Sequence, residues 1–347
     1  MNLLGNLDCE AGWSGAALPE GVRRRISLYA ALFAACVPPD SEGDGDGEGD
    51  SEGDGNGGGG EPHQLWAPAP VDPARLIAHP GWTPPIMRVA GPSGPQASAP
   101  DRSPADAPGR FGLAWADPAA RAANDRSRTL AIAQALGVAL PGARVVASLA
   151  ELDEQLGGFA GRPWICKARW TAAGRDRARG AGSVLDGELR ARIGRMLARL
   201  GPLVFEPWLD RVADLGVCGA IGGGEVALRE PHRLITDPRG GFLGIELAPI
   251  EPAIAEPFAA VARAAASRLA VETGYRGPFA VDGFVYRDRG AHHLHPLCEL
   301  NARHSFGWIA HGLARRLGIR RLGFDAPPPG ATVLIAPGDD RVTAWCT

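Results

Sequence analysis

Lysine occurs once in this chain, and its position is the first feature that could do chemistry. Lys167 is the only lysine among the 36 lysine and arginine residues. Lysine carries a compact ammonium on a flexible stem, whereas arginine presents a planar fork of five donors. Lysine at this position indicates a narrow polyanion site with no room for the fork. Chance survival of one lysine, under a compositional drift toward arginine, is the alternative.

A second candidate site consists of two acids and an amide. Asp282 lies in the apolar stretch FAVDGFV, and Glu299 and Asn301 lie in the stretch CELNA. Residues two apart in a strand share a face, and the two stretches predict an antiparallel hairpin in which all three side chains lie close together. Carboxylate and amide oxygens suit Mg²⁺, which completes its shell with phosphate oxygens and water. Two acids that face solvent from a hairpin are the alternative.

Two features that could bind an anion accompany these residues. Arg303 and Ser305 lead into a helix expected to begin near Phe306, and the free N–H groups and dipole at a helix start favour an anion. A Gly- and Arg-rich segment at 171–183 follows Lys167 and is expected to be a loop whose N–H groups bind phosphate. Gly174 and Gly180 are its candidate contacts, although such loops are common and the signal is weak by itself.

The elements that must position these residues alternate between helices and strands. Asp117-Pro118 begins a helix that Gly137 ends, and Ser148 with Glu151 forms a capping box at the start of a short helix. The pattern predicts further helices at 22–36, 189–200, 256–273 and 305–317, and strands or hairpins near the start and at 163–170, 203–209, 216–230 and 279–302. This order predicts an α+β fold with largely antiparallel sheets.

Composition divides the chain into segments. Residues 40–60 hold eight acids and no base, and residues 62–109 hold twelve prolines. Neither segment carries enough apolar surface to offset chain entropy, so the acidic run is expected to be a flexible insert. We predict an N-terminal segment at 1–39 and an acidic disordered insert at 40–61. A Pro-rich and partly ordered continuation of the N-terminal domain is expected at 62–115. A main domain at 116–325 and a C-terminal tail at 326–347 complete the predicted organisation.

Charge and cysteine usage limit the classes of partner. The net charge of -3 comes from the acidic run, and the mildly basic remainder favours a phosphate-bearing small ligand over nucleic acid. The six cysteines are dispersed, and the longest early apolar stretch, at 27–37, is too short to span a bilayer. We expect no secretory signal at the start of the sequence, because residues 1–20 lack a basic start followed by an apolar run. We therefore expect a cytoplasmic protein with reduced thiols and with neither a membrane nor a nucleic-acid partner.

The arrangement resembles the ATP-grasp superfamily over about residues 116–320. Lys167 before a Gly-rich loop, then Glu206 at the end of the stretch LVFE, then Asp282, and then ELNAR at 299–303 carry the resemblance. It implies two α+β subdomains that hold ATP between antiparallel sheets, preceded by a small N-terminal α/β domain, which here carries the acidic insert. In such enzymes ATP phosphorylates a carboxylate, and an amine or, more rarely, a thiol displaces the phosphate.

The resemblance also implies a role for each matching position. Lys167 would contact the α- or β-phosphate, and Arg303 would hold the transferring phosphoryl group, so that both would be catalytic. Arg126, in the stretch ANDR, stands where many members have a second phosphate-binding lysine. The remaining assignments are Glu206 with Pro207 and Trp208 for adenine, Asp214 for the ribose hydroxyls, and Asp282, Glu299 and Asn301 for one or two Mg²⁺.

One departure from the family pattern concerns an arginine. Many ligases of this type carry arginine two residues before the metal-binding aspartate, whereas this chain has Ala280 there. The arginine that steadies the tetrahedral intermediate must then come from elsewhere, and Arg229, Arg233 and Arg303 are the candidates.

The resemblance predicts an Mg²⁺-dependent ligase that joins a small carboxylate to a small amine and forms ADP and phosphate, with homodimerisation as an option. A small-molecule kinase of the same architecture and a non-catalytic ATP-binding module are the alternatives. A transition-metal site at His292, His293, His295 and Cys298 is a weaker hypothesis. Strand alternation places His293 and His295 on one face and Cys298 on the other, and we expect these histidines to face solvent at the hairpin tip.

Overall fold

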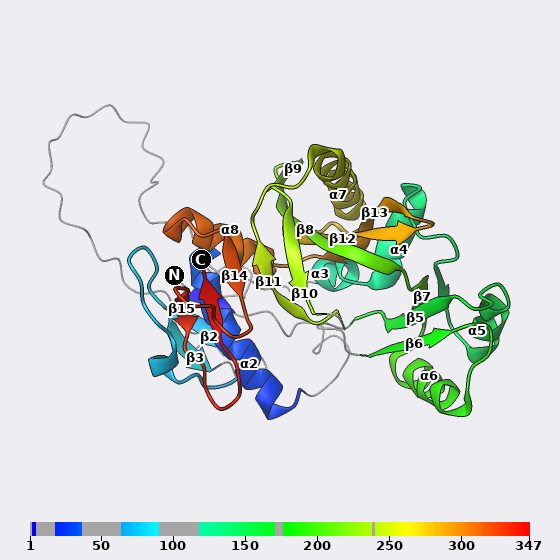
Figure 1. The fold of residues 1–347 in the computed structure, drawn as a ribbon, viewed down its shortest axis with the longest axis horizontal. Coiled ribbons are helices and arrows are strands. Elements are labelled where there is room, and N and C mark those ends of the chain that lie inside the picture. Colours follow the sequence, from blue (N-terminus) through cyan, green and yellow to red (C-terminus); the bar gives the residue numbers. More distant parts are fainter. Residues whose placement is uncertain (1, 5–17, 37–63, 90–117, 171–175, 238–239) are drawn as a thin grey trace, which may run out of the picture.

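A computed structural model of the chain describes residues 2–4, 18–36, 64–89, 118–170, 176–237 and 240–347. These residues form a small lobe at one end, a central sheet with helices, and a third part that combines both ends of the chain (Figure 1). The acidic run at 40–60 lies outside the described residues. Among the residues described, no helix is both long and apolar enough to cross a membrane.

The small lobe carries the lone lysine on a four-stranded antiparallel sheet. Its strand order is β4 (Arg144–Val146), β7 (Leu203–Pro207), β5 (Pro163–Ala168) and β6 (Arg177–Ala181). Helices α5 (Leu149–Leu156) and α6 (Gly187–Leu200) pack on this sheet through a common apolar core. The predicted cap of α5 is present, because Ser148 Oγ accepts from the N–H of Glu151, while the Glu151 carboxylate accepts from the N–H of Ala147, one residue before the cap.

The central sheet has nine strands and holds the predicted hairpins. Strand β8 (Asp210–Gly222) pairs with β9 (Glu225–Leu228) through a glycine turn, and β12 (Gly277–Asp288) pairs with β13 (Ala291–Asn301). The order along the sheet is β13-β12-β8-β10-β11-β14-β16-β15, with β10 (His232–Thr236), β11 (Phe242–Glu246), β14 (Arg321–Gly323), β15 (Thr332–Ile335) and β16 (Ala344–Cys346). All its pairings are antiparallel, which confirms the predicted fold class.

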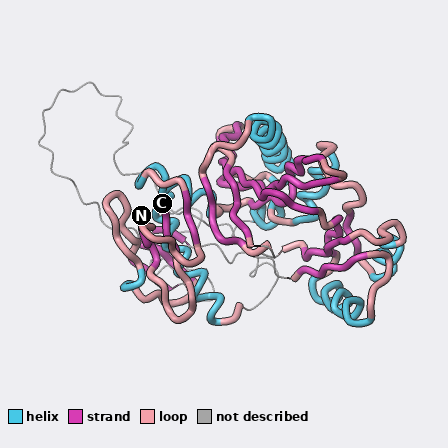
Figure 2. The backbone as a smooth tube through the Cα atoms, viewed as in Figure 1, coloured by secondary structure: helices cyan, strands magenta, loops and turns pink. Residues whose placement is uncertain are grey.

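Helix α7 (Pro252–Thr273) covers one face of this sheet, and the shorter α3 (Pro118–Ala123) and α4 (Arg126–Ala135) lie beside it. The core between them contains Leu215, Val217, Val281 and Leu300 from the strands, each at most 2% exposed. Strands (magenta) gather in the small lobe and in the central sheet, and the helices (cyan) lie mostly on their outer sides (Figure 2).

The third part combines N-terminal and C-terminal segments in one core. Strands β1 (Asn2–Leu4), β2 (Gln64–Ala67) and β3 (Ile86–Val89) form a parallel sheet. Helix α2 (Glu20–Ala30) continues into the 3₁₀ helix η1 (Ala31–Cys36), which packs on α8 (Phe306–Leu317), and a single 3₁₀ turn, η2, spans Pro73–Arg75. Residues 326–347, expected to be a tail, contribute β15 and β16 to the central sheet.

Two further predicted elements differ from the structure. The single helix expected from Asp117-Pro118 to Gly137 is two helices, because Asp125 leaves the helical conformation and caps α4 by accepting from the N–H of Ser127. The prediction of a loop at 171–183 is partly wrong, since residues 177–181 form strand β6. Gly180 lies directly opposite Trp164 in that strand, and a Cβ there would lie 2.2 Å from the Trp164 ring. Because glycine has no side chain, Gly180 leaves room for the indole ring of Trp164.

Candidate functional site

The β12–β13 hairpin places the two acids and the amide together. Asp282 is paired with Glu299 across the hairpin, and Asn301 follows two residues later on the same face. The side-chain amide of Asn301 donates to Asp282 at 3.4 Å. Gly216 of β8 is the partner of Asp282 on the other side, so this face continues across β8 to β10.

The two carboxylates differ in charge balance. Burial, followed by repulsion from Glu299, raises the pKa of Asp282 to about 7. Burial would also raise the pKa of Glu299, but Arg126, Lys167 and Arg303 outweigh it and hold that pKa below its usual value. Neighbouring cations thus outweigh burial at Glu299, whereas at Asp282 the opposing charges of Arg303 and Arg211 do not.

Arg126 connects the small lobe to this acidic pair. Its guanidinium lies 2.7 Å from Glu299 and also donates to the carbonyl of Ala168, at the end of β5. Asn124, two residues earlier, accepts from the N–H of Ala302 and donates to its carbonyl. The break between α3 and α4 therefore fixes the end of the hairpin at the position where the two sheets meet.

Lys167 reaches the same junction from β5. Its ammonium lies 2.5 Å from the carboxylate of Glu206 in β7 and 3.9 Å from the sulfur of Cys298 in β13. Burial lowers the pKa of Lys167, but Cys298 and Glu206 outweigh burial and raise it, so the lysine is a cation at neutral pH. The side chains of both Lys167 and Glu206 are at most 15% exposed.

The short connection between β7 and β8 contains Trp208, and two arginines from neighbouring strands stack on its ring. The Trp208 ring lies 3.7 Å from the Arg179 guanidinium and 5.4 Å from that of Arg211. The N–H of Trp208 donates to the carbonyl of Pro163, and Pro207 has no N–H to offer. Of the residues expected to meet adenine, Glu206 thus contributes a carboxylate at the junction and Trp208 an aromatic face.

Arg211 is a residue of this junction that sequence reasoning missed. Its guanidinium lies 3.0 Å from Asp214, 3.6 Å from Cys298 and 4.0 Å from the Phe284 ring centroid. Asp214 also accepts from Thr236 of β10 and shares the sheet face of Asp282. The pairing of β8 with β12 shifts register beside Arg211. Because of this shift, strand alternation in the sequence does not predict on which face of the sheet the Arg211 side chain lies.

The expectation for His295 and Cys298 is wrong. His295 is 4% exposed, and it lines a pocket together with Cys298, Glu206 and Arg126. The reason is a bulge: between the pairs 282–299 and 284–295, two positions along β12 correspond to four along β13. Burial lowers the pKa of His295 to about 4, so its ring is neutral. Only His292 and His293 are exposed at the hairpin tip, as expected.

The helix start after the hairpin carries the remaining predicted residues. Arg303 donates to the side-chain oxygen of Asn301 at 3.2 Å, which places its charge beside Asp282 and Glu299. Ser305 precedes α8 as predicted, although its side chain makes no capping hydrogen bond. Arg229 stacks on Trp308, and Arg233 is the strand partner of Glu246. Gly174 lies outside the described residues.

The donor set fits Mg²⁺. Asp282, Glu299 and Asn301 offer oxygen atoms from one hairpin face, and the nearby Arg303 and Arg211 do not offset the burial of Asp282 and its repulsion from Glu299. A hard divalent cation prefers such a set, and it would relieve the repulsion that raises the Asp282 pKa. Lys167, Arg126 and Arg303 surround the acids with the positive charge that a triphosphate requires.

Solved structures with a similar fold are enzymes that bind adenine nucleotides. N5-carboxyaminoimidazole synthetase from Staphylococcus aureus, complexed with ADP, matches with a TM-score of 0.42 and 14% identity over 54% of this chain and 46% of that one. The corresponding synthase from Aspergillus clavatus, complexed with ATP, matches with a TM-score of 0.46 and 17% identity over 66% of this chain and 69% of that one.

A third match is the biotin carboxylase domain of Hydrogenobacter thermophilus 2-oxoglutarate carboxylase, in complex with MgADP, ADP and bicarbonate. Its TM-score is 0.47, with 14% identity over 65% of this chain and 62% of that one. All three are ATP-grasp enzymes. At these identities the similarity to ATP-grasp structures concerns the fold alone. A scan of protein-family models gives no match, and a search of curated proteins gives none either.

Proposed function

We propose that the protein is an Mg²⁺-dependent ATP-grasp ligase that joins a carboxylate to an amine and forms ADP and phosphate. The observation that supports this most is the meeting of two sheets at one polar junction. Lys167 comes from the small sheet and reaches Cys298, the neighbour of Glu299, on the large sheet. A cation from one lobe and carboxylates from the other are the two halves of a metal–triphosphate site.

The ligand-free contacts suggest how the triphosphate would be held. Mg²⁺, held by Asp282, Glu299 and Asn301, would neutralise charge on the phosphates. Arg126 and Lys167 now contact Glu299 and Glu206. We expect both cations to turn from these carboxylates to phosphate oxygens when nucleotide enters, because a triphosphate carries more charge than either acid.

The chemical step then needs positioning more than acid or base groups. A carboxylate oxygen of the substrate forms a bond to the γ-phosphorus while the bond to the ADP oxygen breaks. The amine next attacks the acyl carbon, phosphate leaves, and the nitrogen loses a proton to give the amide. Arg303, beside Asn301 and both acids, would hold the transferred phosphoryl group through both steps.

Nucleotide binding is the first test. The protein should bind a non-hydrolysable ATP analogue with Mg²⁺, and a thermal-shift screen should then find carboxylic acids that raise the melting temperature further. Glu299→Gln should weaken analogue binding by roughly tenfold or more, since it removes charge from the metal set. Asp288→Asn is the matched control, because Asp288 is an exposed acid at the other end of the same hairpin. Equal binding by Glu299→Gln and wild type would contradict the proposal.

Product analysis separates a ligase from a kinase. A ligase consumes a carboxylate and an amine and releases one phosphate for each amide formed. A kinase transfers the phosphoryl group to a single acceptor and releases none. Phosphorylated acceptor without free phosphate would therefore replace the ligase assignment while leaving the nucleotide site in place.

A further inference from the structure

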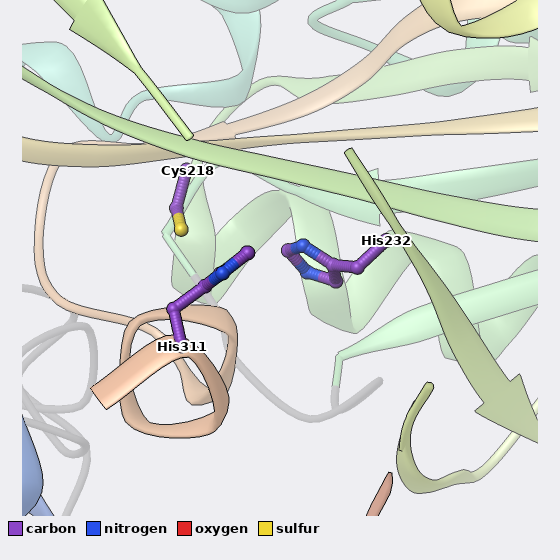
Figure 3. A group of neighbouring side chains, drawn as sticks. All are labelled: Cys218, His232 and His311. Carbon is purple, nitrogen blue, oxygen red and sulfur yellow. The ribbon is translucent and has the colours of Figure 1, made fainter. Parts of the chain in front are cut away.

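A second cluster of possible ligands lies on the same sheet face as the acidic pair and plays no part in the proposed reaction. Cys218 of β8, His232 of β10 and His311 of α8 each direct one donor atom inward, and the three atoms lie within 4.8 Å of one another. The three side chains point toward a common centre from three different elements (Figure 3). Cys218 and His232 are at most 2% exposed, and His311 is half-buried.

Strand register explains why the cluster forms. His232 is paired with Gly216, and Cys218 lies two residues further along β8 on the same face. A Cβ at Gly216 would lie 2.6 Å from the His232 ring, and a Cβ at Gly307 would also lie 2.6 Å from it. Two glycines, one in the sheet and one in α8, thus make the space that His232 fills. His311 lies one helical turn after Gly307, on the helix face that meets the sheet.

Two buried polar atoms in the cluster favour a ligand site. Nδ1 of His232 and Nε2 of His311 are buried and have no hydrogen-bond partner within the described part of the chain. A buried imidazole nitrogen without a partner loses its hydration without compensation. The rings of His232 and His311 are 5.4 Å apart between centroids and nearly perpendicular, so each directs an edge rather than a face at its neighbour. A metal ion would satisfy the orphaned nitrogens.

We propose that Cys218, His232 and His311 bind one Zn²⁺-class ion that fastens α8 to β8 and β10. Two imidazoles and a thiolate form the borderline-soft donor set that Zn²⁺ prefers over Mg²⁺. Ligand atoms around a tetrahedral Zn²⁺ are about 3.5 Å apart, so the cluster needs only small rotamer changes to close on the ion. Three protein ligands leave a fourth position for a water molecule.

The charges around the cluster are compatible with this assignment. Burial lowers the pKa of His232 to about 3 and that of His311 to about 4, which keeps both rings in the neutral form that binds metals. Burial raises the pKa of Cys218 to about 12, and the nearby Arg229 opposes this rise. A metal ion that binds Cys218 would have to displace the thiol proton, and the resulting thiolate would lie near the positive charge of Arg229.

The test uses the full-length, untagged protein, stripped of metal and titrated with Zn²⁺ against a chromophoric chelator. Wild type should bind one Zn²⁺ per chain and melt at a higher temperature with Zn²⁺ than without. Cys218→Ser and His311→Gln should each weaken binding by roughly a hundredfold or more and lose the shift in melting temperature. Cys166→Ser is the matched control, because Cys166 is an equally buried strand cysteine in the small lobe.

Two further measurements separate this site from the acidic one. Co²⁺ should give a thiolate-to-metal charge-transfer band in wild type and in Cys166→Ser, and this band should vanish in Cys218→Ser. Glu299→Gln should keep the tight Zn²⁺ site even where it weakens nucleotide binding, so that failure of the proposed ligase function leaves this inference standing. Absence of Zn²⁺ binding in wild type, unchanged binding in both Cys218→Ser and His311→Gln, or loss of binding in Glu299→Gln would overturn it.

Discussion

The two faces of strands β8, β12 and β13 differ in chemical character. Val217, Val281 and Leu300 face α7 and are at most 2% exposed, whereas Asp282 and Glu299 occupy the opposite face. Val281 and Asp282 are neighbours in sequence. Strand alternation alone therefore assigns one residue to the apolar core and the next to the opposite, polar face.

The apolar face of these strands contributes to stability, whereas we expect the polar face to contribute to function. The α7 face gains free energy from buried apolar area and needs no particular charge. The opposite face buries carboxylates at a cost, visible in the raised pKa of Asp282, and that cost suits a cation-binding site. Substitutions on the two faces should therefore have opposite consequences.

The largest expected effect is the loss of ATP turnover when an acid on the polar face is replaced. Asp282→Asn should lower Mg²⁺-dependent ATP turnover by about a thousandfold or more, because a metal ligand loses its charge while the side chain keeps its shape. The measurement is steady-state ADP release once a substrate pair is known. Asp288→Asn, at the exposed end of the same strand, should turn over like wild type. Full activity in Asp282→Asn would remove the functional difference between the faces.

The next largest effect is a loss of stability when an apolar residue of α7 is shortened. Leu269→Ala should lower the free energy of unfolding by about 2–5 kcal/mol, because Leu269 is fully buried in the α7 core. Urea denaturation measures it, and the KM for ATP of the folded protein should stay unchanged. Val271, on the same helix, is 86% exposed, so Val271→Ala should change stability by less than about 0.5 kcal/mol. Similar losses in both variants would show that α7 does not define a core face.

A smaller effect tests the cation from the other lobe. Lys167→Arg should lower kcat roughly ten- to a hundredfold although charge is kept, because the bulkier fork cannot lie where the ammonium meets Glu206 and Cys298. Arg195→Lys on the exposed surface of α6 is the reverse exchange and should have no effect. Normal turnover by Lys167→Arg would leave the single lysine to chance.

The smallest effect is a pH dependence. An acid whose pKa rises on folding binds more protons when folded, so its contribution to the free energy of unfolding falls as the pH rises from about 4 to about 7. Without Mg²⁺, Asp282→Asn should be more stable than wild type by about 1–2 kcal/mol at pH 8. The two should converge near pH 4. Urea denaturation in a chelator at several pH values measures the difference, and a less stable variant at pH 8 would contradict the assignment.

Much of this comparison was predictable from local sequence. Period-two alternation in FAVDGFV and CELNA predicted the hairpin and the shared face of Asp282, Glu299 and Asn301, and the structure has that register. The helix cap at Ser148, the helix start at Ser305 and the strand of Lys167 followed from patterns a few residues long. Such patterns act through the backbone conformation of neighbouring residues, so one sequence suffices to read them.

Tertiary structure alone decided which distant groups meet. The bulge in β13 turned His295 inward, the pairing of β5 with β7 placed Glu206 beside Lys167, and Arg126 reached Glu299 from a helix break. The approach of Cys218, His232 and His311 requires a strand register and a helix packed on the sheet. These contacts depend on the free energy of packing between segments far apart in the chain, which no local pattern encodes.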